Sequence, residues 1–309
     1  MKKFFLLFAA AIMTVGVMSA QDINKALEIY NNGAMELQMG NKEGALNLFL
    51  EALAMAETLG EDGAELAGNC KGTIPALNYE IAKDMIEAKS YDEAVAQLNK
   101  TVEVAGLYED PSTAEKASEM LPKVYLSKGN DLFKAKDAAG ALAAYEQSVA
   151  LDSTNAMATL QLGRTYLAVN KPEEAEKALF MAARHGRESE AMKQLSNFWL
   201  KKAQASGKAG KSQEVIDFAK KANSYLENAN AYRLAAGAAQ KLGKNADCIA
   251  YYEKYLELKP NAKDAGGVQF TIAALYQQGG NKEKAREYYQ KASTDPQYGP
   301  QAQEQLKNL

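Results

Sequence analysis

The chain has 309 residues, of which 47% are hydrophobic and 24% are charged, and its formal net charge is −3. Alanine supplies much of the hydrophobic content and the seven prolines lie mostly at expected element boundaries, a composition that suits helices throughout. The weak acidic balance gives no reason to expect nucleic-acid binding.

Residues 1–20 differ in character from the rest of the chain. Lysines 2 and 3 precede an apolar stretch over 4–11, and small residues stand before Gln21. This pattern predicts a secretory signal peptide that is removed before Gln21, after which the net charge would be about −5 because two lysines are lost. An uncleaved membrane anchor is the alternative, but the apolar stretch is shorter than the roughly 18 residues that a spanning helix needs.

A helix-turn-helix pattern recurs along residues 22–309. In the clearest copy, over 155–185, Gly163 in the first helix is followed by a turn at 170–172 and then by Ala175 and Leu179 in the second helix. The other copies likewise pair a small residue, or Val in one case, with a bulky residue or Ala four positions later. With the clearest copy included, the seven pairs are Ala45/Phe49, Ala94/Leu98, Ala141/Tyr145, Ala175/Leu179, Val215/Ala219, Cys248/Tyr252 and Ala285/Tyr289. A period in the thirties predicts a stacked helical solenoid.

The predicted repeats occupy approximately 26–59, 75–108, 122–155, 156–189, 196–228, 229–262 and 266–298, with a cap over 299–309. Extra residues separate the first three copies. The glycine-rich segment 58–73 predicts a helix end and a loop, and Asp110-Pro111-Ser112 predicts a turn and a helix start. Val215 at the small-residue position and two glycines before it predict that the fifth repeat is the least stable internal one.

The pattern resembles the tetratricopeptide repeat, a helix-turn-helix unit of about 34 residues, over essentially all of 22–309. Lys259-Pro260 matches the family's terminal proline. The resemblance implies an all-α fold: a right-handed superhelical solenoid of about seven repeats with a C-terminal capping helix. It also implies a concave groove lined by the first helix of each repeat, which in this family commonly binds peptides.

Transferring that face by register predicts the residues that line the groove. The polar positions proposed for binding are Lys123, Asn130, Lys134, Arg164, Asn197, Lys201, Gln204, Arg233 and Lys241. The same face includes Leu126, Phe133, Leu160, Gln161, Leu167, Lys208, Leu234, Gln240, Phe270, Thr271, Gln277 and Gln278. No Asp or Glu falls on this face from the third to the seventh repeat. We therefore expect the groove to bind an extended, acidic peptide segment or a carboxy terminus; solvated lysines without a partner are the alternative.

The family's two-carboxylate clamp pairs Lys with Asn, but Leu126 stands where the lysine partner of Asn130 belongs, so binding of chaperone tails is not expected. The single histidine, His185, lies between arginines at an expected helix end, which favours a capping role. Cys70 and Cys248 lie about five repeats apart, too far for a disulfide, and no metal or cofactor site is expected.

These features predict a non-enzymatic interaction scaffold of the bacterial cell envelope, in the periplasm or alternatively secreted. Two other functions stay open. The groove could serve a carbohydrate-binding or enzymatic envelope component as a substrate cleft, or the first repeats could form a self-assembly module.

Overall fold

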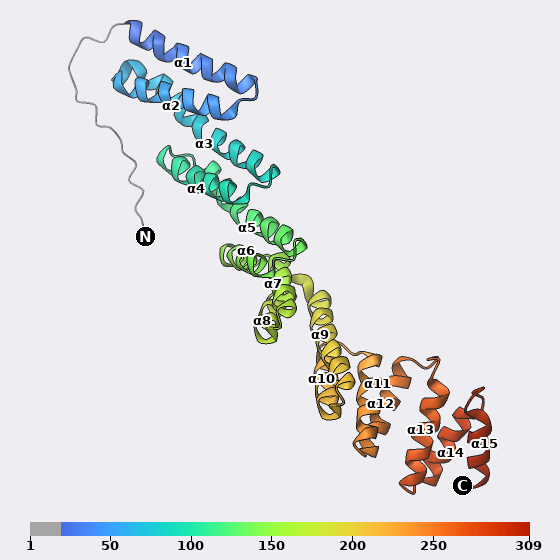
Figure 1. Cartoon of the computed structure of the whole chain (residues 1–309). Coiled ribbons are helices and arrows are strands. Elements are labelled where there is room, and N and C mark those ends of the chain that lie inside the picture. The colour runs from blue at the N-terminus through green and yellow to red at the C-terminus, as the bar shows by residue number, and fades with distance from the viewer. Residues whose placement is uncertain (1–19) are drawn as a thin grey trace. The chain divides into compact units, whose positions relative to one another are not determined.

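The computed structural model describes residues 20–309, which are almost entirely helical and contain no strand (Figure 1). These residues divide into two compact units that meet in sequence between Asp131 and Leu132, within one helix. The expected signal peptide lies outside the described residues, apart from Ala20, at which the first helix begins. Each unit is described by itself.

The N-terminal unit consists of two helical hairpins and the first part of a fifth helix. Its elements are α1 (Ala20–Gln38), α2 (Lys42–Thr58), the 3₁₀ helix η1 (Gly60–Gly63), α3 (Ala64–Glu87), α4 (Tyr91–Leu107) and α5 (Pro111–Lys134) as far as Asp131. The start of α5 at Pro111 confirms the predicted turn and helix start. Phe49 on α2 is 2% exposed, and a Cβ added to Gly33 on α1 would lie 3.0 Å from its ring.

The prediction of a loop over 58–73 is wrong beyond Gly63, because α3 begins at Ala64. Gly68 and Gly72 lie inside this helix and are exposed. Each therefore lowers the stability of the helix by no more than about 1 kcal/mol relative to alanine. Leu66, Cys70 and Ile74 follow one another at four-residue spacing and are all buried. Burial of this stripe offsets the poor helix propensity of the glycines.

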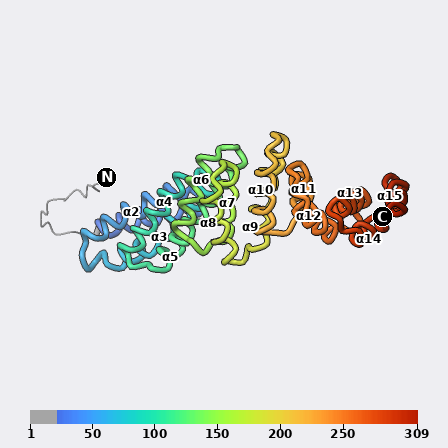
Figure 2. The backbone as a smooth tube through the Cα atoms, turned by 90° about the horizontal axis from the view of Figure 1, so that it is seen from below, coloured from blue at the N-terminus to red at the C-terminus, as the bar shows by residue number. Residues whose placement is uncertain are grey.

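The C-terminal unit continues α5 and adds successive helical hairpins, whose turns can be followed along the backbone in Figure 2. Its elements are α6 (Ala138–Leu151), α7 (Ala156–Ala168), α8 (Pro172–Ala182), the π turn η2 (Ala183–Arg187), α9 (Glu188–Lys208), α10 (Ser212–Tyr225), α11 (Ala229–Lys241), α12 (Asn245–Leu258), α13 (Ala265–Gln278), α14 (Lys282–Ala292) and α15 (Gly299–Lys307). Within residues 20–309 the helices thus form seven hairpins and a final helix, as predicted.

Local sequence explains where these helices begin and end. The Asn155 side chain accepts hydrogen bonds from the backbone N–H groups of Met157 and Ala158 at 3.1 Å, which caps α7. Asn170 then adopts a left-handed φ of 60°, which ends the hairpin's first helix, and Pro172 begins α8. Gly186, at φ 92°, separates the end of α8 from α9, so His185 lies at a helix end as predicted.

The hairpins close where small residues were predicted. Six of the seven predicted positions have no exposed surface and the seventh, Val215, is 3% exposed. A Cβ added to Gly163 on α7 would lie 2.5 Å from Leu179 Cγ and 3.2 Å from the Ala175 carbonyl oxygen. The two helices therefore touch at Gly163, and no larger residue fits without movement of its neighbours.

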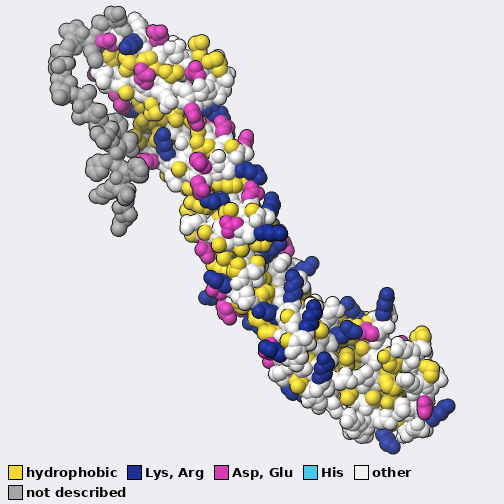
Figure 3. Space-filling model, in the orientation of Figure 1, with side chains coloured by type: hydrophobic (Ala, Val, Ile, Leu, Met, Phe, Trp, Pro, Cys, Tyr) yellow, Lys and Arg dark blue, Asp and Glu magenta, His cyan; other side chains and the backbone are white. Residues whose placement is uncertain are grey.

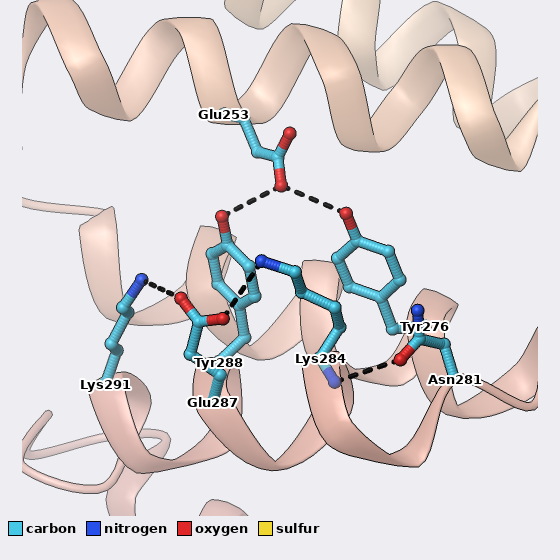
Figure 4. Close-up of polar contacts among 7 residues, drawn as sticks. All are labelled: Glu253, Tyr276, Asn281, Lys284, Glu287, Tyr288 and Lys291. Atoms are coloured by element: carbon cyan, nitrogen blue, oxygen red, sulfur yellow. Dashed lines mark hydrogen bonds and ion pairs between the residues drawn. The ribbon is translucent and has the colours of Figure 1, made fainter.

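Tyrosine–carboxylate hydrogen bonds join helices of different hairpins. Glu253 on α12 accepts hydrogen bonds from the hydroxyls of Tyr276 at 3.1 Å and Tyr288 at 2.9 Å, which come from α13 and α14 (Figure 4). The two tyrosine rings stack with centroids 5.9 Å apart. Tyr166 on α7 likewise donates to Glu146 on α6 at 2.6 Å. These bonds fix one hairpin against the next beyond what apolar packing provides.

Candidate functional site

The C-terminal unit contains a hollow of about 440 Å³ between α7 and α9, here called the α7–α9 pocket. It is lined by Phe133, Arg164, Leu167, Ala168, Gln194, Asn197, Phe198, Lys201, Lys202 and Ala205. Three of these side chains are cationic and none is a carboxylate. The lining therefore combines positive charge, two amides and two phenylalanines.

The cations of the α7–α9 pocket have no carboxylate partner within residues 20–309. Arg164 Nη1 donates to the Gln161 side-chain oxygen at 3.2 Å, and the Lys202 ammonium lies 5.6 Å from the centroid of the Phe198 ring. Lys201 is exposed. Mutual repulsion among three uncompensated cations makes the pocket a favourable place for an anion.

A larger hollow of about 780 Å³, here called the α9–α13 pocket, lies among α9, α11, α13 and residues 295–298. Its cations are Lys208, Arg233, Lys241 and Lys263 and its carboxylates are Asp264 and Asp295. Figure 3 shows Lys and Arg side chains gathered over α9 and α11, with few Asp or Glu among them.

Both carboxylates of the α9–α13 pocket are engaged by neighbouring groups. Arg233 Nε and the Tyr255 hydroxyl each donate to Asp264 at 2.6 Å. Asp295 accepts from the backbone N–H groups of Gln297 and Tyr298, both at 2.9 Å. The lysines of this pocket form no ion pair within the described part of the chain. Three of its four cations thus stay uncompensated.

The Asp264 carboxyl group stays ionised at neutral pH. Partial burial disfavours the Asp264 carboxylate, but the Tyr255 hydroxyl and the Arg233 guanidinium outweigh that cost and hold its pKa below the usual value. Burial, together with the hydrogen bond to Asp264, raises the pKa of Tyr255 to about 12. Asp264 therefore neutralises Arg233, and the three lysines outnumber the one remaining carboxylate, Asp295.

The structure distributes the predicted groove residues unevenly. Arg164, Asn197 and Lys201 line the α7–α9 pocket, and Gln204, Arg233 and Lys241 line the α9–α13 pocket. The three remaining predicted residues, all on α5, lie elsewhere. Lys123 and Asn130 belong to the N-terminal unit, and Lys134 belongs to the C-terminal unit but lines neither pocket.

One expectation about the groove is wrong, and a second needs an addition. Leu160 is 2% exposed and packs in a cluster with Leu179 and Leu195, so it does not line the groove. The named first-helix positions carry no acid, but Asp264 and Asp295 line the α9–α13 pocket beside them. Both aspartates lie in turns outside the first helices, where helical register gives no signal. Only the placement of Asp264 directly before α13 marks it as a helix-start residue.

The residues that could react or bind a metal do not form a second site within residues 20–309. Cys70 and Cys248 are buried and unpaired, as predicted, and burial raises the pKa of each thiol to about 11. No group of three or more His, Cys, Asp or Glu side chains is arranged to hold a metal in this range. Its helices are all too short or too polar to cross a membrane.

Comparison with known families identifies the repeats. Models described as tetratricopeptide repeat match residues 27–64, 132–197, 229–262 and 267–294, which together make up just over half of the chain. Matches fall in both compact units. The chain therefore carries tetratricopeptide repeats, the class of module that generally mediates protein–protein interaction.

Individual similar proteins cover different shares of the chain. The photosystem I assembly protein Ycf3 of Synechococcus sp. (strain CC9311) is 34% identical over 87 residues, which is 28% of this chain and 49% of that protein. The chain thus spans about half the length of this curated relative. The solved MamA structure is 22% identical over 59% of this chain and 96% of its own, with a TM-score of 0.34. A tetratricopeptide repeat protein from Parabacteroides merdae is 14% identical over 93% and 98%, with a TM-score of 0.28.

Proposed function

We propose that this chain is a non-enzymatic interaction scaffold whose C-terminal unit binds an extended, acidic segment of a protein partner. The observation that carries the proposal is the α7–α9 pocket, in which three cations face one hollow without a carboxylate although the whole chain has a net charge of −3. The assembly role in the name of Ycf3 agrees with a scaffold.

Each kind of group in the α7–α9 pocket fits a part of such a segment. Arg164 can hold a carboxylate through two parallel hydrogen bonds, and Lys201 and Lys202 add positive charge beside it. Gln194 and Asn197 can each donate to and accept from an extended backbone. The partner's carboxylates would relieve the repulsion among the cations, so binding should weaken as salt rises.

The test is display of random dodecapeptides on phage, selected on the purified protein, followed by affinity measurement on the selected peptides. We expect enrichment of Asp and Glu, and loss of affinity when salt is raised from 50 to 500 mM. Lys201→Glu should weaken the selected peptides about tenfold, equivalent to about 1.4 kcal/mol.

The matched control is Lys193→Glu, which makes the same charge change at an exposed position of α9 outside both pockets. It should change affinity less than twofold. Selected peptides without acidic enrichment, or equal losses for the two variants, would show that the pocket does not bind acidic segments.

We further propose that the scaffold works in the periplasm, to which residues 1–20 direct it; secretion is the alternative destination. The basic start, the apolar stretch and the small residues before Gln21 support this proposal. Cell fractionation and N-terminal sequencing test it. We expect the envelope fraction to contain a chain that begins at Gln21, and a full-length chain in the cytoplasm would contradict the proposal.

A further inference from the structure

Gly237 lies in the middle of α11 within an alanine-rich run, and the fold does not explain it. After proline, glycine is the least favourable residue in a helix interior, so a helical glycine usually marks a left-handed φ or a close contact. Gly237 has neither, because its φ is not positive and a Cβ added there would meet nothing within 4 Å. Gly163, by contrast, is held against Leu179.

The position of Gly237 in its repeat corresponds to pocket-lining residues in the two preceding repeats. Gly237 stands eleven residues before Cys248, the buried small residue of its hairpin. At the same offset, the two preceding repeats carry Arg164 and Gln204, which line the pockets with long polar side chains. Gly237 lines the α9–α13 pocket without filling it.

The apolar residues that line the remaining pocket are buried or half-buried, whereas its lysines are exposed. Its apolar members are Val215, Leu234, Ala238, Tyr252 and Val268. Lysines 208, 241 and 263 line the same hollow without an ion-pair partner among the described residues. Its volume of about 780 Å³ lies within the range of about 300–1,000 Å³ that ligand sites occupy.

We propose that the α9–α13 pocket is an anchor subsite for one aromatic or long aliphatic side chain of the bound peptide segment. An acidic residue next to the anchor in the peptide is held by Lys208 and Lys241. The missing side chain of Gly237 provides the space, which makes this glycine the specificity-determining residue of the subsite. The inference rests on the proposed function and adds which peptides the groove selects.

The test variant is Gly237→Gln, which places the residue of the preceding repeat into the pocket. Because the site is open and glutamine favours helix more than glycine does, the variant should unfold at no lower temperature than the wild type. Gly72→Gln is the matched control, since Gly72 is also a helical glycine with nothing within 4 Å of an added Cβ, but it lies in the N-terminal unit.

Random dodecapeptides displayed on phage are selected in parallel on the wild type and on both variants. The wild type and Gly72→Gln should enrich peptides that carry an aromatic or long aliphatic residue within two positions of Asp or Glu. Gly237→Gln should enrich acidic peptides without this anchor, and it should bind the anchored peptides at least tenfold more weakly.

The outcomes separate this inference from the function on which it rests. Identical enrichment on the wild type and Gly237→Gln, or acidic enrichment on the wild type without an apolar anchor, would overturn the subsite and leave the acidic groove standing. A lack of acidic enrichment on the wild type would overturn both. A lower unfolding temperature for Gly237→Gln would show that the glycine serves packing, which also contradicts the inference.

Discussion

Substituting alanine for Gly163 tests the close crossing on which each hairpin depends. The new methyl group would lie 2.5 Å from Leu179 Cγ, 2.9 Å from Leu179 Cδ2 and 3.2 Å from the Ala175 carbonyl oxygen. Leu179 has no exposed surface and Ala175 is equally buried, so neither can move into free space.

The expected magnitude is the balance of two effects. Overpacking a well-packed core costs about 1–3 kcal/mol, whereas replacing a helical glycine with alanine contributes about 1 kcal/mol of stability. We therefore expect Gly163→Ala to lose up to about 2 kcal/mol of stability. Gly237→Ala, which makes the same chemical change at an open helical site, should gain up to about 1 kcal/mol.

Urea unfolding followed by circular dichroism and by fluorescence measures both variants. Trp199 is the single tryptophan, and it stacks on Phe218 at 5.4 Å, so its emission reports the hairpin of α9 and α10 next to the substituted one. A gain in stability for Gly163→Ala as large as that for Gly237→Ala would refute the close-crossing explanation.

A double substitution identifies Leu179 as the cause. Leu179→Ala alone should cost about 2–5 kcal/mol because it leaves a cavity at a fully buried site. In that background the atoms nearest to the added methyl group are gone, so Gly163→Ala should no longer destabilise the protein. A cost that persists in the double variant would place the clash elsewhere, for example on the α8 backbone.

Three further measurements test the electrostatic features of the structure. Burial raises the pKa of Tyr145 and of Tyr255 to about 12, above the usual value of about 10. Stability from both phenols should therefore be complete below pH 10 and be lost between pH 10 and 12, as urea midpoints measured across that range would show. Glu253→Ala removes two hydrogen bonds to tyrosine hydroxyls, which should cost about 1–3 kcal/mol and raise hydrogen exchange in α13 and α14 but not in α7. Asp264→Asn frees Arg233 and removes a negative charge, so acidic peptides should bind up to about fivefold more tightly at low salt, by fluorescence anisotropy; weaker binding would contradict the assigned charge balance.

The periodic part of this structure could be predicted from the sequence because its signal is steric. Ala141 and Ala175 have no exposed surface because two helices cross there, and that constraint repeats in every hairpin. The seven hairpins and the final helix follow directly. The segment 58–73 was harder, since the poor helix propensity of its glycines predicts a loop, whereas burial of the stripe at Leu66, Cys70 and Ile74 decides the outcome.

The candidate site could be predicted only in part, because charges pair through three-dimensional contacts. Helical register placed Arg164 and Arg233 on one face, but it gave no information about Asp264, which reaches Arg233 from a turn 31 residues further along. Leu160 shows the opposite error: it was assigned to the groove by register, yet its side chain packs into the core beside Leu195. Register locates a face to within a residue, and a single residue decides between groove and core.

Gly163 and Gly237 show how packing separates residues that serve the fold from those that serve an external contact. Both interrupt a helix that alanine would favour, and helix propensity does not distinguish them. A Cβ added to Gly163 would clash with Leu179, whereas a Cβ added to Gly237 would meet no atom within 4 Å. Openness alone assigns no role, because Gly72 is equally open and lines neither pocket; Gly237 differs in that it lines the α9–α13 pocket. In this molecule that position lies in a hollow lined by apolar side chains and by lysines that form no ion pair within the described residues.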